Sequence, residues 1–278
     1  MNDFKWTVGE LLARYELEPD LLDVFVEGGF DREVLSQHRS GGCAGRTFYE
    51  IDAVDVPAKV VEGHGLTLGN KQRVIALSKE LCRAPSSARV VCLVDRDLDH
   101  WFAAIADSAR LRWSIFCSVE NHFLTKDTLR DIAVTTARAK ISSFDAFFDS
   151  LEVTLRQLYA LRLADRELEL DLKWTALRKY LSNNSGTVTF DLKKYALAVL
   201  NSNAALNRKD DFAASIDRWS HNLGCDIRLA SRGHDFTELL AWAISEFGGQ
   251  KEFTSPAAIE RLFVLLARSI SSLGQELQ

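Results

Sequence analysis

The chain of 278 residues carries 34 lysines and arginines against 39 aspartates and glutamates, which gives a formal net charge of −5. Hydrophobic residues make up 47% of the chain and charged residues 26%, with four prolines, so disordered, collagen-like and mucin-like proteins are excluded. The acidic balance also excludes a protein that coats nucleic acid through its global charge, although it permits local contacts with phosphates.

The sequence predicts a soluble, cytoplasmic protein. Its first residues lack a basic segment followed by an apolar stretch, so we expect no signal peptide. The longest apolar runs, such as residues 262–267, are far too short to cross a bilayer. The five cysteines form no CxxC pair and have no regular spacing, so neither a zinc ribbon nor a disulfide framework is expected.

Strand-like and helix-like segments alternate over the N-terminal part of the chain, which we expect to form a domain over residues 1–130. The predicted strands span residues 21–26, 46–56, 89–94 and 113–119, and the predicted helices span 30–38 and 71–82. Strands separated by helices of this length predict an α/β fold with a mostly parallel sheet flanked by helices. No membrane-spanning segment interrupts this pattern.

The remaining chain, residues 131–278, is expected to form an α-helical C-terminal region that contacts substrate, a second copy or a partner. The helices are predicted near residues 144–164, 173–181, 191–200, 211–223, 236–247 and 255–266. We find no internal repeat and no low-complexity linker, so this region is expected to pack on the α/β domain.

Acidic residues follow three of the predicted strands: Glu27, then Asp95 and Asp97, then Glu120. Ligands of parallel sheets gather at the carboxyl ends of the strands, so we expect these carboxylates to converge. Such a group is costly unless a divalent cation neutralises it, and hard oxygen ligands favour Mg²⁺ or Mn²⁺. The sequence therefore predicts a metal site formed by Glu27, Asp95, Asp97 and Glu120.

Each acidic position also has an ordinary structural explanation. An Asp-x-Asp pair after a strand is common, and its two side chains point the same way only if the backbone stays extended. Asp99 is either an outer ligand or a helix cap, and Glu120 is either a fourth acidic group of the site or a cap for the helix that follows.

The Glu27-Gly28 pair after the first strand and the Asp95-x-Asp97 pair after a later one resemble the signature of the TOPRIM family. The resemblance covers about the first 125 residues. It implies that Glu27 acts in acid/base chemistry or metal binding and that Asp95 and Asp97 hold the metal. The chain departs from the Asp-x-Asp-x-Gly ending of some TOPRIM enzymes, because Asp99 stands where those enzymes have glycine. The sequence therefore leaves the backbone path after Asp97 open.

A closer resemblance is to the TOPRIM-like nucleases encoded beside ABC-type ATPases, which serve as effectors of PARIS-type anti-phage defence. Five segments carry it: Val26-Glu27-Gly28, Gly69-Asn70-Lys71, Val94-Asp95-Arg96-Asp97, Ser118-Val119-Glu120-Asn121 and Arg232-Gly233-His234-Asp235-Phe236. This resemblance implies a homodimeric, metal-dependent nuclease that its ATPase partner holds inactive until infection is sensed. The implied target is nucleic acid, with RNA such as tRNA ahead of DNA.

Two segments carry local positive charge. Residues 71–90 have five basic and one acidic side chain, and residues 171–210 have seven basic and three acidic ones, so each segment has a net charge of +4. The candidates for phosphate contacts are Lys71, Arg73, Arg96, Lys179 and Lys193. For most of them a solvated helix face is the ordinary explanation. Lys71 is the exception, because at a helix start it can lean toward the carboxylates and act catalytically.

Three functions remain open at this point. The first is a metal-dependent nuclease in which Glu27, Asp95, Asp97 and Lys71 are catalytic. The second is a non-catalytic TOPRIM-like subunit that docks to an ATPase. The third is a phosphatase of the haloacid-dehalogenase type, which ranks last because that fold places its Asp-x-Asp after the first strand, where this chain has Glu27. His234 and Asp235 precede a helix, so Asp235 is first of all a helix cap and a role for His234 near substrate is the lesser alternative.

Overall fold

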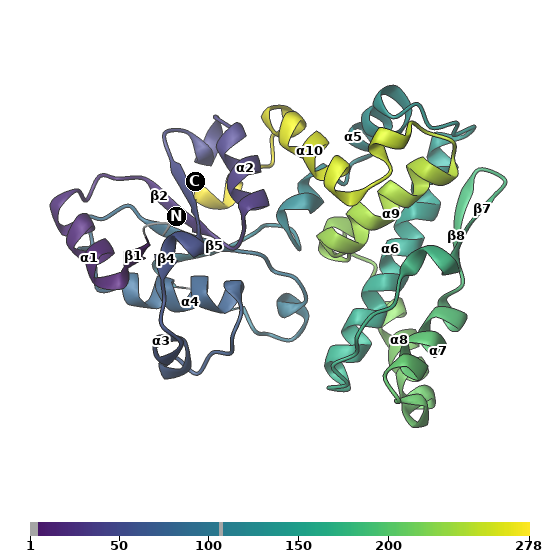
Figure 1. Ribbon diagram of the computed structural model, residues 1–278, viewed down its shortest axis with the longest axis horizontal. Helices are drawn as coiled ribbons and strands as arrows, with labels where there is room; N and C mark the ends of the chain where they lie inside the picture. The colour runs from purple at the N-terminus through teal and green to yellow at the C-terminus, as the bar shows by residue number, and fades with distance from the viewer. Residues whose placement is uncertain (1–4, 106–107) are drawn as a thin grey trace. The chain divides into compact units, whose positions relative to one another are not determined.

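The computed structural model describes residues 5–105 and 108–278 (Figure 1). The chain forms two compact units. The first unit combines the residues up to Val119 with the C-terminal segment Phe263–Gln278, and the second is the continuous stretch Glu120–Leu262. The sequence suggests a boundary near residue 130 with all later residues in the helical part, whereas in the structure the last segment returns to the first unit.

A four-stranded parallel sheet forms the centre of the first unit. Its strand order is β3-β2-β5-β6, with β2 at Asp23–Val26, β3 at Thr47–Glu50, β5 at Val91–Val94 and β6 at Leu111–Trp113. In the register, Val24 of β2 lies between Phe48 and Val91, and Cys92 faces Leu111. All residues of β2 and β5 are buried, as expected for central strands that are covered on both faces.

Helices cover both faces of this sheet (Figure 1). The helices of the first unit are α1 at Val8–Leu17, α2 at Gly29–Gln37, α3 at Ala58–Gly63 and α4 at Asn70–Leu81. Apolar side chains of α1 and α4 pack with Phe25, Cys92 and Leu111 in one core. The opposite face carries α2 and the C-terminal segment, which is held by a hydrogen bond between His38 Nδ1 and the Ala267 carbonyl at 2.8 Å.

Two of the predicted strands are shorter in the structure. The segment 46–56 divides into β3, a 3₁₀ turn at Ile51–Ala53 and the short strand β4 at Val54–Asp55, which pairs with β1 at Trp6–Thr7 in a separate sheet. The strand predicted over 113–119 is wrong beyond Trp113. From Ser114 onward the chain crosses the end of β5, and the Cys117 carbonyl accepts a hydrogen bond from the Asp97 backbone N–H at 2.8 Å.

The second unit is mainly helical. Its elements are α5 at Lys126–Arg130, a π-helical turn at Asp131–Thr136, α6 at Phe144–Glu167, β7 at Leu181–Asn184, β8 at Thr187–Phe190, α7 at Leu192–Ser202, α8 at Lys209–Asn222 and α9 at Gly233–Glu246. The long helix α6 begins at the N-cap Ser143 and buries a stripe of apolar side chains. Helix α10, Pro256–Leu266, crosses the boundary, because its residues up to Leu262 belong to the second unit and those from Phe263 to the first.

The helix predicted over 173–181 is wrong. Only a 3₁₀ turn forms at Leu177–Tyr180, and Leu181 begins an antiparallel hairpin. The turn of this hairpin uses Ser185 and Gly186, both with positive φ values of 52° and 92°, which suits a tight connection between twisted strands. The parallel sheet and the helical second unit nevertheless confirm the predicted α/β class with a helical C-terminal region. Among the described residues, no helix has both the length and the apolarity needed to cross a membrane.

Candidate active site at the carboxyl edge of the sheet

The structure places Glu27 and Asp95 at the ends of two neighbouring strands. Glu27 follows β2 and Asp95 follows β5, which pair in parallel, so both residues leave the same edge of the sheet. Glu27 Oε1 accepts a hydrogen bond from the Asp95 backbone N–H at 2.9 Å. The short strands thus fix the distance between the first carboxylate and the start of the Asp-x-Asp segment.

Lys71 lies inside the acidic group. Its Nζ atom is 3.1 Å from Asp97 Oδ2 and 2.6 Å from Asp99 Oδ2, and its side chain is only 15% exposed. The structure therefore brings together four residues singled out from the sequence, Glu27, Lys71, Asp95 and Asp97. Asp99 also belongs to the group. It starts a 3₁₀ turn, of which Leu98 is the N-cap, and Asp99 contacts Lys71 instead of capping a helix.

The backbone before α4 explains how Lys71 reaches the carboxylates. Gly69 is the N-cap of this helix and has a φ of 131°, a conformation that glycine adopts without strain from a side chain. Asn70 is the first residue of the helix. Its amide Nδ2 donates to the Glu27 carbonyl at 3.1 Å. This contact holds the start of α4 against the end of β2 and directs Lys71 into the site.

The Asp-x-Asp segment is not extended, so the condition under which its two side chains would point the same way is not met. Asp97 has a φ of 45°, in the left-handed region that aspartate tolerates better than most residues. Its backbone N–H bonds to the Cys117 carbonyl, while the Asp99 N–H donates to the Arg96 carbonyl at 2.8 Å. The turn at Asp97 sends its carboxylate toward Lys71.

The electrostatics of the site leave Glu27 poised to exchange a proton near neutral pH. Burial raises the pKa of Glu27 to about 7. The Asp95 N–H bond and the nearby Lys71 ammonium oppose this shift, while Asp97 and Asp99 add to it. Burial would lower the pKa of Lys71, but attraction to Asp97, Asp99 and Glu27 outweighs burial and raises it, so the ammonium stays protonated.

Two further basic candidates of the first unit have distinct surroundings. Arg73 donates to Asp52 Oδ1 at 2.6 Å and to the carbonyls of Ile51 and Val54, so its guanidinium holds the chain between β3 and β4. The contact with nucleic acid predicted for Arg73 therefore competes with this structural role. Arg96 donates from Nε to the Ser114 carbonyl at the end of β6 and faces a surface pocket.

The other predicted site residues belong to the second unit. Glu120 lies in the 3₁₀ turn Val119–Phe123, next to Asn121, whose amide donates to the Ser231 carbonyl at 3.2 Å. Lys179 lies in the turn Leu177–Tyr180 and Lys193 in the first turn of α7. The participation of Glu120 in the acidic site stays a prediction.

Asp235 is an ion-pair partner and not a helix cap. Helix α9 begins at Gly233 with Arg232 as its N-cap, and the Asp235 carboxylate receives two hydrogen bonds from Arg162, at 2.7 Å and 3.2 Å. The Arg162 guanidinium lies 3.9 Å from the centre of the Trp174 ring. Asp235 therefore serves the packing of α6 and α9. His234 is exposed beside it.

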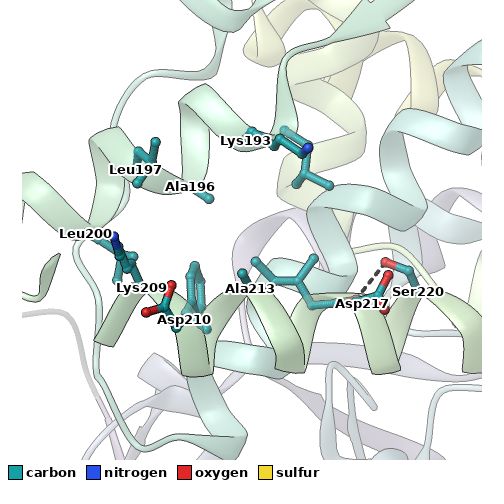
Figure 2. Close-up of a pocket in the computed structure, with 12 residues that line it drawn as sticks. Lys193, Ala196, Leu197, Leu200, Lys209, Asp210, Ala213, Asp217 and Ser220 are labelled. Carbon is teal, nitrogen blue, oxygen red and sulfur yellow. Dashed lines mark hydrogen bonds between the residues drawn. The ribbon is translucent and has the colours of Figure 1, made fainter. Parts of the chain in front are cut away.

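A groove in the second unit runs between α7 and α8 and has a volume of about 460 Å³ (Figure 2). Its floor is apolar, formed mainly by Leu197, Leu200 and Ala213, while Lys193 lies at one rim. Asp210 and Asp217 balance Lys193 and Lys209 around the rim, so the groove has no excess positive charge. This balance gives no support to a phosphate contact at Lys193.

The donor set at the sheet edge suits a hard divalent cation, because Glu27, Asp95, Asp97 and Asp99 offer only oxygen atoms. The Lys71 ammonium also shows that the site attracts positive charge. Within residues 5–105 and 108–278, however, no three histidine, cysteine or acidic side chains are gathered closely enough to hold a metal ion. The chemistry of the residues fits Mg²⁺ or Mn²⁺, whereas their present placement is organised around lysine.

Trp113 is a neighbour of the site that the sequence did not single out, whereas for Asp99 the sequence left open an outer ligand or a helix cap. The Lys71 Nζ atom lies 5.4 Å from the centre of the Trp113 ring. The i+2 spacing to Asp97 is a weak signal for Asp99, whereas Trp113 has none, because its position depends on the pairing of β5 with β6. Comparison of the chain with protein-family models and with curated proteins finds no match.

Proposed function

We propose that the first unit is the catalytic part of a divalent-metal-dependent nuclease. The observation that carries this proposal is the half-buried Glu27, with a pKa raised to about 7. Its carboxylate accepts a bond from the Asp95 backbone, at the start of the segment in which Asp97 and Asp99 pair with Lys71. A carboxyl group that exchanges protons near neutral pH beside further carboxylates suits general acid/base catalysis of phosphodiester hydrolysis.

Each residue has a separate task in this proposal. Asp95 and Asp97 would hold Mg²⁺ or Mn²⁺, with Glu27 completing the ligand set or transferring a proton. When bound, the ion supplies charge that stabilises the phosphoryl transition state and makes water more acidic. Lys71 orients an anionic phosphate oxygen and offsets the negative charge of the carboxylates as substrate enters.

The biological setting of the proposal depends on the sequence resemblance. By that resemblance the substrate is RNA, with tRNA as the leading candidate, and the enzyme is a homodimeric toxic effector of anti-phage defence under the control of an ABC-type ATPase. Among the basic residues singled out from the sequence, Lys71 beside the carboxylates supports a nucleic-acid substrate despite the net charge of −5. The second unit offers surface for the substrate or the partner.

The test compares the wild-type chain with Glu27→Gln on tRNA, single-stranded RNA and plasmid DNA, each with Mg²⁺, Mn²⁺ or EDTA. We expect Glu27→Gln to lower cleavage at least 100-fold, because the substitution removes the proton-transferring group and a ligand oxygen. Glu62→Gln, at an exposed position of α3, serves as the matched control and should cleave like wild type. Full activity of Glu27→Gln would refute the proposal.

A second function is favoured by one observation: Lys71 already neutralises Asp97 and Asp99 without a metal. This arrangement suits a non-catalytic subunit that keeps a TOPRIM-like shell for docking to an ATPase. Calorimetric titration with Mg²⁺ and Mn²⁺ separates the two functions. The nuclease requires binding that Asp97→Asn abolishes, whereas the docking subunit requires none.

A further inference from the structure

A pocket of about 360 Å³ lies along the outer edge of the sheet in the first unit. It is lined by Arg96, Ile105, Ser108, Leu111, Arg112 and Trp113. Strand β6 is the last strand of the order β3-β2-β5-β6, so its outer edge has no neighbouring strand in this sheet. Arg112 and Trp113 are consecutive residues of that strand and point to opposite faces, and both reach the pocket because it follows the edge.

Two guanidinium groups give the pocket its charge. Arg96 donates from Nε to the Ser114 carbonyl, and Arg112 Nη1 donates to the carbonyls of Leu111 and Ser108 at 3.0 Å and 3.3 Å. Neither arginine forms an ion pair with a carboxylate of the described residues. Glu276 acts on Arg96 only from a distance, and burial raises its pKa to about 7, so its charge is partial near neutral pH. Of the described residues that line the pocket, Arg96 and Arg112 are the ones that carry a formal charge, so this described lining is positive.

A short chain of contacts joins the pocket to the candidate active site. Arg96 stands between Asp95 and Asp97 in the sequence. On the other side, the Lys71 Nζ atom lies 5.4 Å from the centre of the Trp113 ring and bonds to Asp97. Trp113 thus contacts the candidate active site through Lys71 and also lines the pocket, so a substrate phosphate among the carboxylates would lie next to the pocket.

We propose that the pocket binds the nucleotide next to the scissile phosphodiester, with its phosphate on Arg96 and Arg112 and its base against Trp113. The proposal rests on the function proposed above and adds a subsite and a substrate class to it. Cationic groups beside an aromatic ring are the usual way to bind single-stranded nucleic acid, because unpaired bases expose their faces. The pocket therefore selects an unpaired nucleotide, as found in a loop or a single-stranded end.

Binding is measured without catalysis, so that the subsite can be tested separately. A fluorescein-labelled single-stranded RNA of ten nucleotides is titrated with protein in EDTA at several salt concentrations. We expect Arg112→Gln to weaken binding about tenfold and to reduce the slope of log K against log salt by about 0.7, the value for one phosphate contact on a single strand. Arg112→Lys, which keeps the charge, should restore most of the salt slope.

Arg39→Gln is the matched control. Arg39 is exposed, follows the carboxyl end of α2 and lies outside both basic segments. We expect this variant to bind within twofold of wild type. Equal losses in Arg112→Gln and Arg39→Gln would overturn the proposal, because they would indicate binding to the general surface charge.

A photocrosslink tests the same contact in the wild-type protein, in case Arg112→Gln fails to fold. An oligonucleotide that carries one 4-thiouridine is irradiated with the full chain, and the adduct is mapped by peptide mass spectrometry. We expect the adduct between residues 108 and 114. Adducts confined to other segments would overturn the subsite. If Glu27→Gln abolishes cleavage while Arg112→Gln binds normally, the proposed subsite is refuted and the proposed nuclease function is not. If Glu27→Gln cleaves fully while Arg112→Gln binds weakly, the nuclease function is refuted and the binding pocket is not.

Discussion

At the scale of single residues, the candidate site depends on two half-buried groups, the acid Glu27 and the cation Lys71. Glu27 is bonded through Oε1 to the backbone after β5, so its carboxyl group has little freedom to leave the sheet edge. Lys71 balances the two aspartates that follow. Glu27 therefore has a pKa near 7, whereas Lys71 keeps its positive charge at that pH.

The raised pKa of Glu27 predicts how stability depends on pH. The unfolded carboxyl group, with an ordinary pKa of 4.5, loses its proton before the folded one does, so unfolding becomes easier as pH rises from about 4.5 to 7. Glu27→Gln removes this loss and should stabilise the first unit at pH 8 by about 2 kcal/mol relative to wild type. Urea unfolding at pH 5 and pH 8 measures the difference. Glu276→Gln is the comparison, because its raised pKa of about 7 predicts a separate contribution of the same sign.

Removing the internal cation predicts a dependence on metal. Lys71→Gln leaves Asp97 and Asp99 facing each other without a counter-charge, which should lower stability by about 2 kcal/mol, less than for a fully buried pair because Asp97 is 37% exposed. Millimolar Mg²⁺ should restore the melting temperature of Lys71→Gln and have little effect on Lys79→Gln, an exposed position of the same helix. A Lys71→Gln protein insensitive to Mg²⁺ would contradict the assigned metal ligands.

At the scale of elements, buried helix faces carry the stability of the second unit. Phe147 of α6 is fully buried and lies 5.3 Å from Phe247, ring centre to ring centre, whereas Val153 of the same helix is 56% exposed. Phe147→Ala should therefore cost about 3–4 kcal/mol in the free energy of unfolding, and Val153→Ala should change it by less than about 0.5 kcal/mol. Urea titrations followed by circular dichroism measure both values. Similar costs for the two would show that α6 does not pack as described.

Elements that follow from local pattern were predicted well, and those that depend on distant partners were not. The short apolar runs that became β2 and β5 carry their own signal, and their acidic ends led to Glu27 and Asp95. The run after Trp113 looks like a strand, but its backbone groups bond to the turn that follows β5, which a local pattern does not reveal. The hairpin formed by β7 and β8 was missed because the apolar spacing of residues 173–181 also fits a helix.

The same distinction applies to the site. Position after a strand was enough to single out Glu27, Asp95 and Asp97, and position at a helix start was enough for Lys71. Asp99 required knowledge of the left-handed turn at Asp97, which sets where the next carboxylate lies. The ion pair of Asp235 with Arg162 joins residues far apart in the chain, so the sequence offered only the local explanation of a helix cap.

At the scale of the whole molecule, the first unit is completed by the end of the chain. Arg46 bonds to the Leu277 carbonyl at 2.7 Å, and a Cβ atom added at Gly42 would lie 1.9 Å from the Gly274 carbonyl oxygen. Gly42→Ala should thus destabilise the first unit by about 2 kcal/mol or more and expose the C-terminal segment to protease. Gly63→Ala, with open space at the end of α3, is the control and should be neutral. Limited proteolysis with mass spectrometry reports the release of the segment. A Gly42→Ala chain that resists the protease would argue against the described packing of the C-terminal segment on the first unit.

The return of the chain to the first unit has a consequence for synthesis on the ribosome. Residues 120–262 are continuous, so the second unit can finish folding as soon as it has emerged, whereas the first unit waits for residues 263–278. At translation rates of about 5–20 residues per second, the interval between residue 119 and the last residue is about 8–30 s. In a nascent chain, the segments that carry Glu27 and Asp95 are therefore present for some seconds before the rest of the first unit, residues 263–278, has been made. This order of events delays completion of the first unit until residues 263–278 have been synthesised.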